Sequence, residues 1–279
     1  MKYLILGESS FYGSSFLKYL VEKGEKEVTG LSRPEFDLRK DFRLPNADVI
    51  VNFCAETKDS WEAERALHTN TICTNRLFEE IRKKELQLFI HVSTPEVFGS
   101  SSFWLKEKNA IKPSSPYGVS RAASEMLLNA YWKAYKTPVI ITRTANIYGP
   151  EQQDFRLIPK AFRMINDGEK FPIHGKGNSS RSFIHINDAC EALYVLSKKA
   201  AWGESYHIST QKTYKIVEVV HMICDILGKD FKKHTEFKPE ILGKAHAYHL
   251  NSDKMRSLAW YDKVELEKGL LDYANHHSF

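Results

Sequence analysis

A tyrosine and an arginine four residues apart are the first candidates for chemistry in this sequence. Tyr117 and Arg121 occur in SPYGVSRAASE, and residues at positions i and i+4 share one face of a helix. The phenol of tyrosine ordinarily ionises near pH ~10. A unit charge about 4 Å away, at an effective dielectric of ~20, is worth about 4 kcal/mol, or roughly three pK units. The pair therefore predicts a phenol with a pKa near neutrality, where general acid/base catalysis is most efficient.

The composition is that of an ordinary soluble globular protein. The 279 residues are 42% hydrophobic and 27% charged, and the net charge of +5 is spread along the chain. This pattern calls for no nucleic-acid partner and fits an anionic small molecule. The four cysteines are far apart and contain no C-x-x-C, which indicates neither a disulfide framework nor a metal site. The apolar runs are too short for a signal peptide or a membrane span, so we expect a cytoplasmic protein with no membrane partner.

Apolar segments that are rich in β-branched residues alternate with helical patterns along the first half of the chain. The expected strands are 3–7, 27–32, 48–55, 88–94 and 138–149, and the expected helices are 11–23, 61–84 and 116–135. No helix is expected between 33 and 47. This alternation predicts an α/β fold with a doubly wound parallel sheet that is covered on both faces.

The character of the chain changes after Pro150. Glycine-rich turns mix with expected helices at 157–167, 188–199, 215–227 and 263–276 and with expected strands at 183–186 and 206–210. We expect residues 1–150 to form the sheet domain and residues 151–279 to form mainly a smaller lobe. Segments near 176–200 are expected to return to the main sheet.

A glycine-containing loop, GESSFYG, follows the first expected strand and opens the first expected helix. Gly7 permits the sharp turn, and Gly13 permits close packing of the helix on the strand. Ser10 stands where a glycine would let the backbone approach phosphates, and its hydroxyl is a possible phosphate donor. The helix that begins at Phe11 offers unpaired N–H groups to a pyrophosphate. The loop predicts a dinucleotide site; the alternative is a plain strand–turn–helix.

The residues after the second expected strand bear on the choice between NAD and NADP. An acid at this point hydrogen-bonds ribose hydroxyls, whereas an arginine receives a 2′-phosphate. The sequence has Ser32 and Arg33 there and no acid. It therefore favours NADP(H), with NAD(H) as the alternative. Asp37 and Leu38 are expected beneath the adenine.

Several motifs in the same order resemble the extended short-chain dehydrogenase/reductases of the NAD(P)-dependent epimerase/dehydratase type, most of which act on nucleotide sugars. GESSFYG is similar to the G-x-x-G-x-x-G of that family, and SPYGVSRAASE to its S-P-Y-G-x-S-K-x-x-x-E. The further similar segments are VNFCAET, LHTNTICTNRLFE, HVSTPEVFG, RTANIYGP and HGKGNSSRSFIHINDACEAL. The resemblance implies a Rossmann-type dinucleotide-binding domain, a smaller substrate-binding lobe, a nucleotide-sugar substrate and oxidoreductase chemistry.

The resemblance also implies roles for residues in the reaction. Tyr117 would be the acid/base that exchanges a proton with a sugar hydroxyl or carbonyl. Thr94 and Ser93 would hydrogen-bond the same oxygen, and the nicotinamide would exchange a hydride with that carbon. Arg121 would take the place of the family's lysine, which lowers the pKa of the tyrosine and binds the nicotinamide ribose.

Other residues would bind the two ligands. Asn146 and Arg181 would hold the phosphates or the nucleotide of the substrate. Tyr148 would lie near the nicotinamide, and Ala55 and Asn70 would belong to the cofactor site. Members of the family often form homodimers through a four-helix bundle that includes the tyrosine helix, so we expect a homodimer.

Two departures from the family pattern affect the expected activity. Arg121 keeps the charge of the usual lysine but is bulkier and planar. Sugar 4,6-dehydratases of the family carry Thr-Asp-Glu where this chain has Thr94, Pro95 and Glu96. Proline replaces one of the two acids that serve the elimination of water. Glu96 remains a candidate base next to a keto group, with a structural carboxylate as its alternative role.

Three functions remain open at this point. The first is an epimerase or dehydratase that acts on a nucleotide sugar, and the second is an NADPH-dependent reductase of a nucleotide 4-keto-sugar. The third, from another class, is a cofactor-binding sensor or scaffold without turnover, which the replacement of lysine by Arg121 would favour. His91 lies inside an expected strand and is interpreted as a packed core residue.

Overall fold

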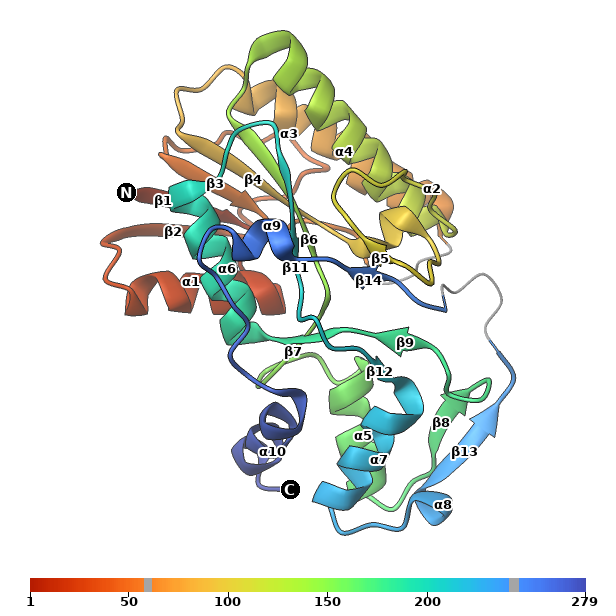
Figure 1. The fold of residues 1–279 in the computed structure, drawn as a ribbon. Coiled ribbons are helices and arrows are strands. Elements are labelled where there is room, and N and C mark those ends of the chain that lie inside the picture. Colours follow the sequence, from red (N-terminus) through yellow and green to blue (C-terminus); the bar gives the residue numbers. More distant parts are fainter. Residues whose placement is uncertain (58–61, 241–245) are drawn as a thin grey trace.

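A six-stranded, all-parallel sheet forms the centre of the molecule (Figure 1). The structure, a computed structural model, describes residues 1–57, 62–240 and 246–279. The sheet order is β11-β6-β4-β3-β1-β2. Its strands are β1 (Lys2–Leu6), β2 (Glu27–Leu31), β3 (Val49–Asn52), β4 (Leu88–Ser93), β6 (Val139–Thr144) and β11 (Ser205–Ile208). The α/β class and the parallel sheet predicted from the sequence are confirmed.

Helices cover both faces of this sheet. Helices α1 (Phe11–Glu22) and α6 (Ile186–Lys199) contact each other and pack with β1 and β3 in one core cluster. On the other face, α3 (Thr74–Ile81) and α4 (Pro116–Tyr135) enclose a second core cluster. Strands β3 and β6 are buried at every residue, as burial on both faces requires.

Residues 61–84, expected as one helix, contain three successive helical segments in their described part. These are α2 (Ala63–Leu67), the π-helical η1 (His68–Cys73) and α3. The π turn coincides with Asn70, whose buried amide bonds outside its own helix. Single π turns inside longer helices frequently mark functional sites.

The expected strand 138–149 is likewise two strands, because the chain leaves the main sheet within it. β6 ends at Thr144, and β7 (Asn146–Tyr148) pairs instead with β10 (Phe183–His185) of the smaller lobe. The amide of Ala145 still donates to the carbonyl of Ile208 (2.9 Å). A continuous run of β-branched residues did not indicate this change of partner.

The smaller lobe lies below the carboxyl end of the sheet in Figure 1. Its core lies among α5 (Leu157–Asn166), α7 (Ile216–Ile226) and α10 (Leu266–His277). The remaining elements are η2 (Pro95–Phe98), β5 (Trp104–Leu105), β8 (Phe171–His174), β9 (Ser180–Arg181), β12 (Tyr214–Lys215), α8 (Phe231–His234), β13 (Thr235–Lys238), β14 (His249–Leu250) and α9 (Asp253–Arg256). Most of these strands are too short to give a periodic pattern in the sequence.

A buried ion pair ties α4 to β6. The Arg143 guanidinium donates to both oxygens of Glu125, with Nη2 at 2.6 Å from Oε2, and both side chains are almost fully buried. Arg143 also stacks over Phe98 of η2, at 4.8 Å from the ring centroid, and lies 3.3 Å from His207 Nε2. Burial and the neighbouring Arg143 charge lower the pKa of His207 to about 3, so this imidazole stays neutral beside the cation.

Removal of the carboxylate from this pair should strongly destabilise the fold. We expect Glu125→Ala to lower the free energy of unfolding by about 3–5 kcal/mol, because the Arg143 charge stays buried without its partner. Urea denaturation measures the change. Glu80→Ala is the control, because its pair with Lys83 is solvent-exposed and should contribute less than about 1 kcal/mol. Equal effects of the two substitutions would contradict this account.

Candidate active site

The loops after the parallel strands meet at the carboxyl edge of the sheet. The strand order reverses at β1, which has β2 on one side and β3 on the other. Open α/β sheets bind ligands at such a switch point. The loop of Gly7 and Ser10 follows β1, the loop of Ala55 follows β3, and Thr94 follows β4. The topology therefore brings the predicted cofactor and catalytic residues to one edge.

The glycine loop has the close contacts that its sequence predicted. Gly7 has a φ of +79°, which side chains rarely adopt. A Cβ at Gly13 would lie 2.5 Å from the carbonyl oxygen of Gly7. The Ser10 hydroxyl accepts from Gly13 N (3.1 Å) and donates to Gly7 O (2.7 Å). Its proton is thus directed to Gly7 O, its oxygen caps α1, and its donation to a phosphate stays a prediction. The first N–H groups of α1, beginning at Phe11, face the same edge.

Tyr117 lies in the first turn of α4, beside the strand end that carries Thr94. Ser115 caps this helix by accepting from Gly118 N (3.1 Å). A Cβ at Gly118 would lie 2.8 Å from the Glu96 carbonyl oxygen, so glycine permits the close approach of the two segments. Thr94 lies close enough to the Tyr117 phenol to lower its pKa, and the Glu96 charge acts on the same phenol in the opposite direction. The structure therefore brings these three predicted residues together.

Thr94 and Pro95 also shape the start of η2. The Thr94 hydroxyl accepts from the amide of Glu96 (3.3 Å), and Pro95 occupies the first helical position. Proline is well suited to that position because it needs no amide hydrogen there. The residue that departs from the dehydratase pattern therefore has a structural role here.

Arg121 is fully buried and is directed at β4. Its Nη2 donates to the carbonyl of Val92 and lies 3.2 Å from His91 Nε2. His91 Nδ1 in turn lies 3.3 Å from the side-chain nitrogen Nδ2 of Asn52. The side-chain oxygen Oδ1 of Asn52 accepts from the backbone amide of Cys54. A neutral imidazole has one acceptor nitrogen, so His91 can accept a hydrogen bond from only one of the two groups, Arg121 Nη2 and Asn52 Nδ2. The predicted burial of His91 is confirmed, and burial and the Arg121 charge keep its pKa well below the ordinary value.

The prediction of an acidic phenol is wrong for this structure. Burial raises the pKa of Tyr117 above its ordinary value, and the opposing effect of the Arg121 charge is smaller. The sequence argument counted the cation and left out the loss of hydration. The guanidinium also donates a hydrogen bond to the carbonyl of Val92. In this structure Arg121 therefore does not bring the pKa of Tyr117 below its ordinary value.

The predicted substrate residues Asn146 and Arg181 come together through a tyrosine that sequence reasoning did not find. The Tyr248 hydroxyl donates to Asn146 Oδ1 (3.3 Å), and the Arg181 guanidinium stacks over the Tyr248 ring at 4.3 Å. Arg181 also donates to the carbonyls of Ser180 and His246. Glu96 and Tyr117 both act on the pKa of Tyr248, which burial raises. No motif in the sequence marked Tyr248, since it belongs to a short irregular segment.

Two predicted cofactor residues have mainly structural contacts. The side-chain oxygen of Asn70 accepts from the backbone amide of Glu56 (2.7 Å). Its side-chain nitrogen donates to the carbonyl of Glu56 (3.0 Å) and to Ser120 Oγ (3.0 Å). It thereby holds the half-buried loop of Ala55 against α4. Leu38 is buried in the core beneath β1.

Tyr148 is placed away from the site in which it was expected. Its ring is buried in the core of the smaller lobe and packs edge-on against His185. A Cβ at Gly269 of α10 would lie 2.1 Å from the Tyr148 hydroxyl oxygen. The expectation that Tyr148 lies beside a nicotinamide is therefore corrected, because β7 has left the main sheet and packs against α10 instead.

The end of β2 carries charges from two segments. Ser32 Oγ donates to Glu8 Oε1 (2.8 Å). Ser32 and Arg33, which directly follow β2, are not acids, and this contact places the carboxylate of Glu8, from the glycine loop, beside them. Arg33 is exposed, and its charge acts on Asp37. The hydrogen bonds from Arg39 hold the pKa of Asp37 well below its ordinary value.

Buried polar atoms without partners point to a polar ligand at this edge. Within residues 1–57, 62–240 and 246–279, Arg121 Nε and Nη1 and Ser93 Oγ have no hydrogen-bond partner. Such orphaned groups are costly unless a ligand or water satisfies them. With the turn at Gly7, the helix N-terminus at Phe11 and the phenol of Tyr117, they fit a nicotinamide dinucleotide.

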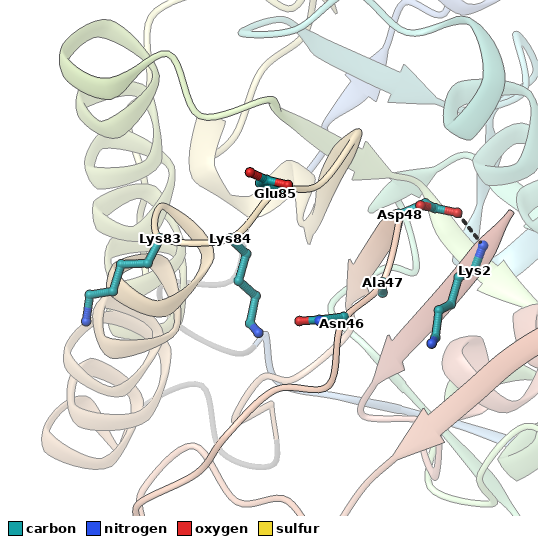
Figure 2. A pocket seen from close by; sticks show the side chains of 7 residues that line it. All are labelled: Lys2, Asn46, Ala47, Asp48, Lys83, Lys84 and Glu85. Carbon is teal, nitrogen blue, oxygen red and sulfur yellow. Dashed lines mark hydrogen bonds between the residues drawn. The ribbon is translucent and has the colours of Figure 1, made fainter.

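The opposite edge of the sheet has a different character. Figure 2 shows a polar pocket there, lined by Lys2, Asn46, Ala47, Asp48, Lys83, Lys84 and Glu85. The amide of Lys2 donates to Asp48 Oδ2 (2.7 Å). Lys84 Nζ donates to the carbonyl of Leu44 (2.8 Å). This pocket lies at the amino ends of β1 and β3, away from the catalytic candidates.

Metal-binding clusters and membrane-spanning helices are both absent from the described part of the chain. It contains no group of three or more His, Cys, Asp or Glu side chains that could hold a metal ion. No helix in the same residues is long and apolar enough to cross a membrane.

Comparison with known proteins places the chain in a family. The model of the NAD dependent epimerase/dehydratase family matches residues 3–210, so the chain belongs to this family. The low-salt glycan biosynthesis protein Agl12 of Haloferax volcanii is 29% identical over an alignment of 299 positions, which covers 97% of this chain and 96% of that protein. The resemblance stated from the motifs is confirmed.

A plant relative and a solved structure extend the comparison. The trifunctional UDP-glucose 4,6-dehydratase/UDP-4-keto-6-deoxy-D-glucose 3,5-epimerase/UDP-4-keto-L-rhamnose-reductase RHM2 of Arabidopsis thaliana is 32% identical over an alignment of 236 positions, which covers 81% of this chain and 35% of that protein. The dTDP-glucose 4,6-dehydratase of Bacillus anthracis, solved in complex with NAD, superposes with a TM-score of 0.89 at 29% identity, covering 100% of this chain and 96% of that one. These relatives are enzymes, and the fold of this chain is a Rossmann-like α/β fold with a parallel central sheet.

The charge of Arg121 should matter more to ligand binding than its shape. We expect Arg121→Lys to retain or raise turnover, because an ammonium keeps a cation beside Tyr117. Arg121→Met should weaken dinucleotide binding by about tenfold or more, since hydrogen bonds to charged groups contribute roughly 1.5–3 kcal/mol. Fluorescence titration and steady-state kinetics measure the two effects. A large loss of activity in the lysine variant would show instead that the site requires the guanidinium.

Proposed function

We propose that this protein is an NAD(P)-dependent oxidoreductase of the epimerase/dehydratase type that acts on a nucleotide sugar. The observation that carries the proposal is the cluster of Tyr117, Thr94 and Glu96 beside the buried cation of Arg121. This cluster lies at the sheet edge that also carries the glycine loop of Gly7. The family membership and the nucleotide-sugar enzymes among the relatives support the same substrate class.

The roles of the residues follow from their contacts. A nicotinamide cofactor, when bound near Arg121 and Ser93, supplies or takes the hydride at one sugar carbon. Tyr117 exchanges a proton with the oxygen on that carbon, and Thr94 hydrogen-bonds the same oxygen. Arg121 favours the phenolate when Tyr117 acts as base, because its charge opposes the effect of burial. Asn146, Arg181 and Tyr248 form the adjoining surface, which we assign to the substrate.

The acids around Tyr117 bear on the type of reaction. Pro95 offers no proton, so Glu96 is the carboxylate left for a step next to a keto group. Epimerisation or reduction at a single carbon needs Tyr117 alone, whereas elimination of water would require Glu96 as well. An NADPH-dependent reductase of a nucleotide 4-keto-sugar is therefore the second candidate, and Pro95 and the exposed Arg33 favour it.

The phenol of Tyr117 is the group whose removal tests this proposal. We expect Tyr117→Phe to reduce turnover of a nucleotide sugar by about 10²–10⁴-fold while cofactor affinity changes little. Because burial holds the pKa of Tyr117 above its ordinary value, the rate of a step that needs the phenolate should rise with pH above neutrality.

NMR of UDP- and dTDP-glucose incubated with the protein, together with cofactor titration, measures both quantities. Full activity of the phenylalanine variant would refute the assignment. Cofactor binding without turnover on any nucleotide sugar tried would favour the sensor or scaffold.

We also propose a homodimer that forms through α4 and its neighbours. Apolar side chains on this surface are strongly exposed: Leu67, Ile72, Val119 and Met126. Val119 and Met126 are seven residues apart and share one face of α4, which contacts α2 and η1. Exposed apolar patches of this kind are typical of interaction surfaces.

A charge on this surface should separate the two copies. We expect Met126→Glu to convert a dimer to a monomer in sedimentation velocity, because the carboxylate would have to be desolvated in the interface. Val21→Glu, on the exposed face of α1, is the matched control and should leave the assembly unchanged. A wild-type protein that sediments as a monomer would end the proposal.

A further inference from the structure

The carboxylate of Glu8 lies across the end of β2, although it belongs to the glycine loop after β1. Ser32, which follows β2, donates from its hydroxyl to Glu8 Oε1 (2.8 Å). A Cβ at Gly30 would lie 2.7 Å from Glu8 Cγ and 2.9 Å from Glu8 Cβ. Gly30 therefore leaves the space that this side chain fills, and the half-buried Glu8 is held over the strand.

The backbone fixes the same arrangement. The amides of Gly7 and Glu8 both point to the carbonyl of Leu31, at 2.8 and 3.4 Å. The loop is thereby fastened to the last residue of β2. In dinucleotide-binding folds, an acid at the end of the second strand accepts from the ribose hydroxyl of the adenosine half of NAD. Here the acid reaches that place from the first loop instead of from the second strand.

The nearby positive charges are less favourably placed to receive a phosphate. Arg39 is paired with Asp37 (2.6 Å). Arg33 is exposed and acts on Asp37 as well. An exposed arginine is hydrated and loses side-chain entropy when it is fixed. The carboxylate of Glu8, by contrast, is already oriented by Ser32 and Gly30.

We propose that Glu8 selects NAD over NADP by accepting from the adenosine 2′-hydroxyl and repelling a 2′-phosphate. The inference rests on the proposed function, because it assumes that a nicotinamide dinucleotide binds at this edge. It is the opposite of the preference predicted from Arg33 alone, so one measurement separates the two. The residues after the second expected strand gave no indication of Glu8, because its contact with Ser32 joins residues 24 positions apart.

Calorimetric titration of the full-length protein with NAD⁺ and NADP⁺ provides the test, and it needs no knowledge of the sugar. The wild type should bind NAD⁺ at least about tenfold more tightly than NADP⁺. Glu8→Gln, which keeps the size of the side chain and removes its charge, should shift the ratio of the two dissociation constants towards NADP⁺ by about tenfold or more. Ser32→Ala should shift the ratio in the same direction by a smaller factor, and it provides a second route if Glu8→Gln does not fold.

Glu27→Gln is the matched control. It removes the same charge from the amino end of the same strand, so the ratio should stay at the wild-type value. Tighter binding of NADP⁺ by the wild type would overturn the proposal. An unchanged ratio in both Glu8→Gln and Ser32→Ala would overturn it as well. A wild type that binds neither dinucleotide would instead refute the proposed function on which this inference rests.

Discussion

The attachment of α4 to β4 and β6 is the constraint on which the candidate site depends. Arg121 donates from this helix to the carbonyl of Val92, and Glu125 pairs with the buried Arg143 one turn further along. The two contacts fix the rotation and height of the helix against the sheet. Tyr117 is thereby held beside Thr94.

The same helix carries an electrostatic conflict that a ligand would relieve. Arg121 is buried, yet two of its nitrogens have no partner in the described residues, and His91 cannot accept from both of its neighbours. Burial also raises the pKa of Tyr117 against the effect of this cation. Stability alone does not explain such an arrangement, because unsatisfied buried donors cost free energy. A bound cofactor that accepts hydrogen bonds from these donors would remove this cost.

Two neighbours of the site stand at positions that no sequence motif specifies. Glu8 reaches the end of β2 across the glycine loop, and Tyr248 joins Asn146 to Arg181 from a short segment near β14. Each lies close to its partners because strands far apart in sequence end at one edge or at one lobe. Tyr148 shows the reverse case, in which a motif residue is turned into the core because its strand changed partners.

The sequence by itself determined the α/β class, the strands of the main sheet, the turn at Gly7 and the candidacy of Tyr117 and Arg121. These follow from local patterns, since hydrophobic periodicity and glycine chemistry act over a few residues. Tertiary structure alone decided the ionisation of Tyr117 and the charge next to Ser32. Both depend on desolvation and on groups brought from distant segments, which are properties of the packed molecule and leave no mark on the spacing of residues.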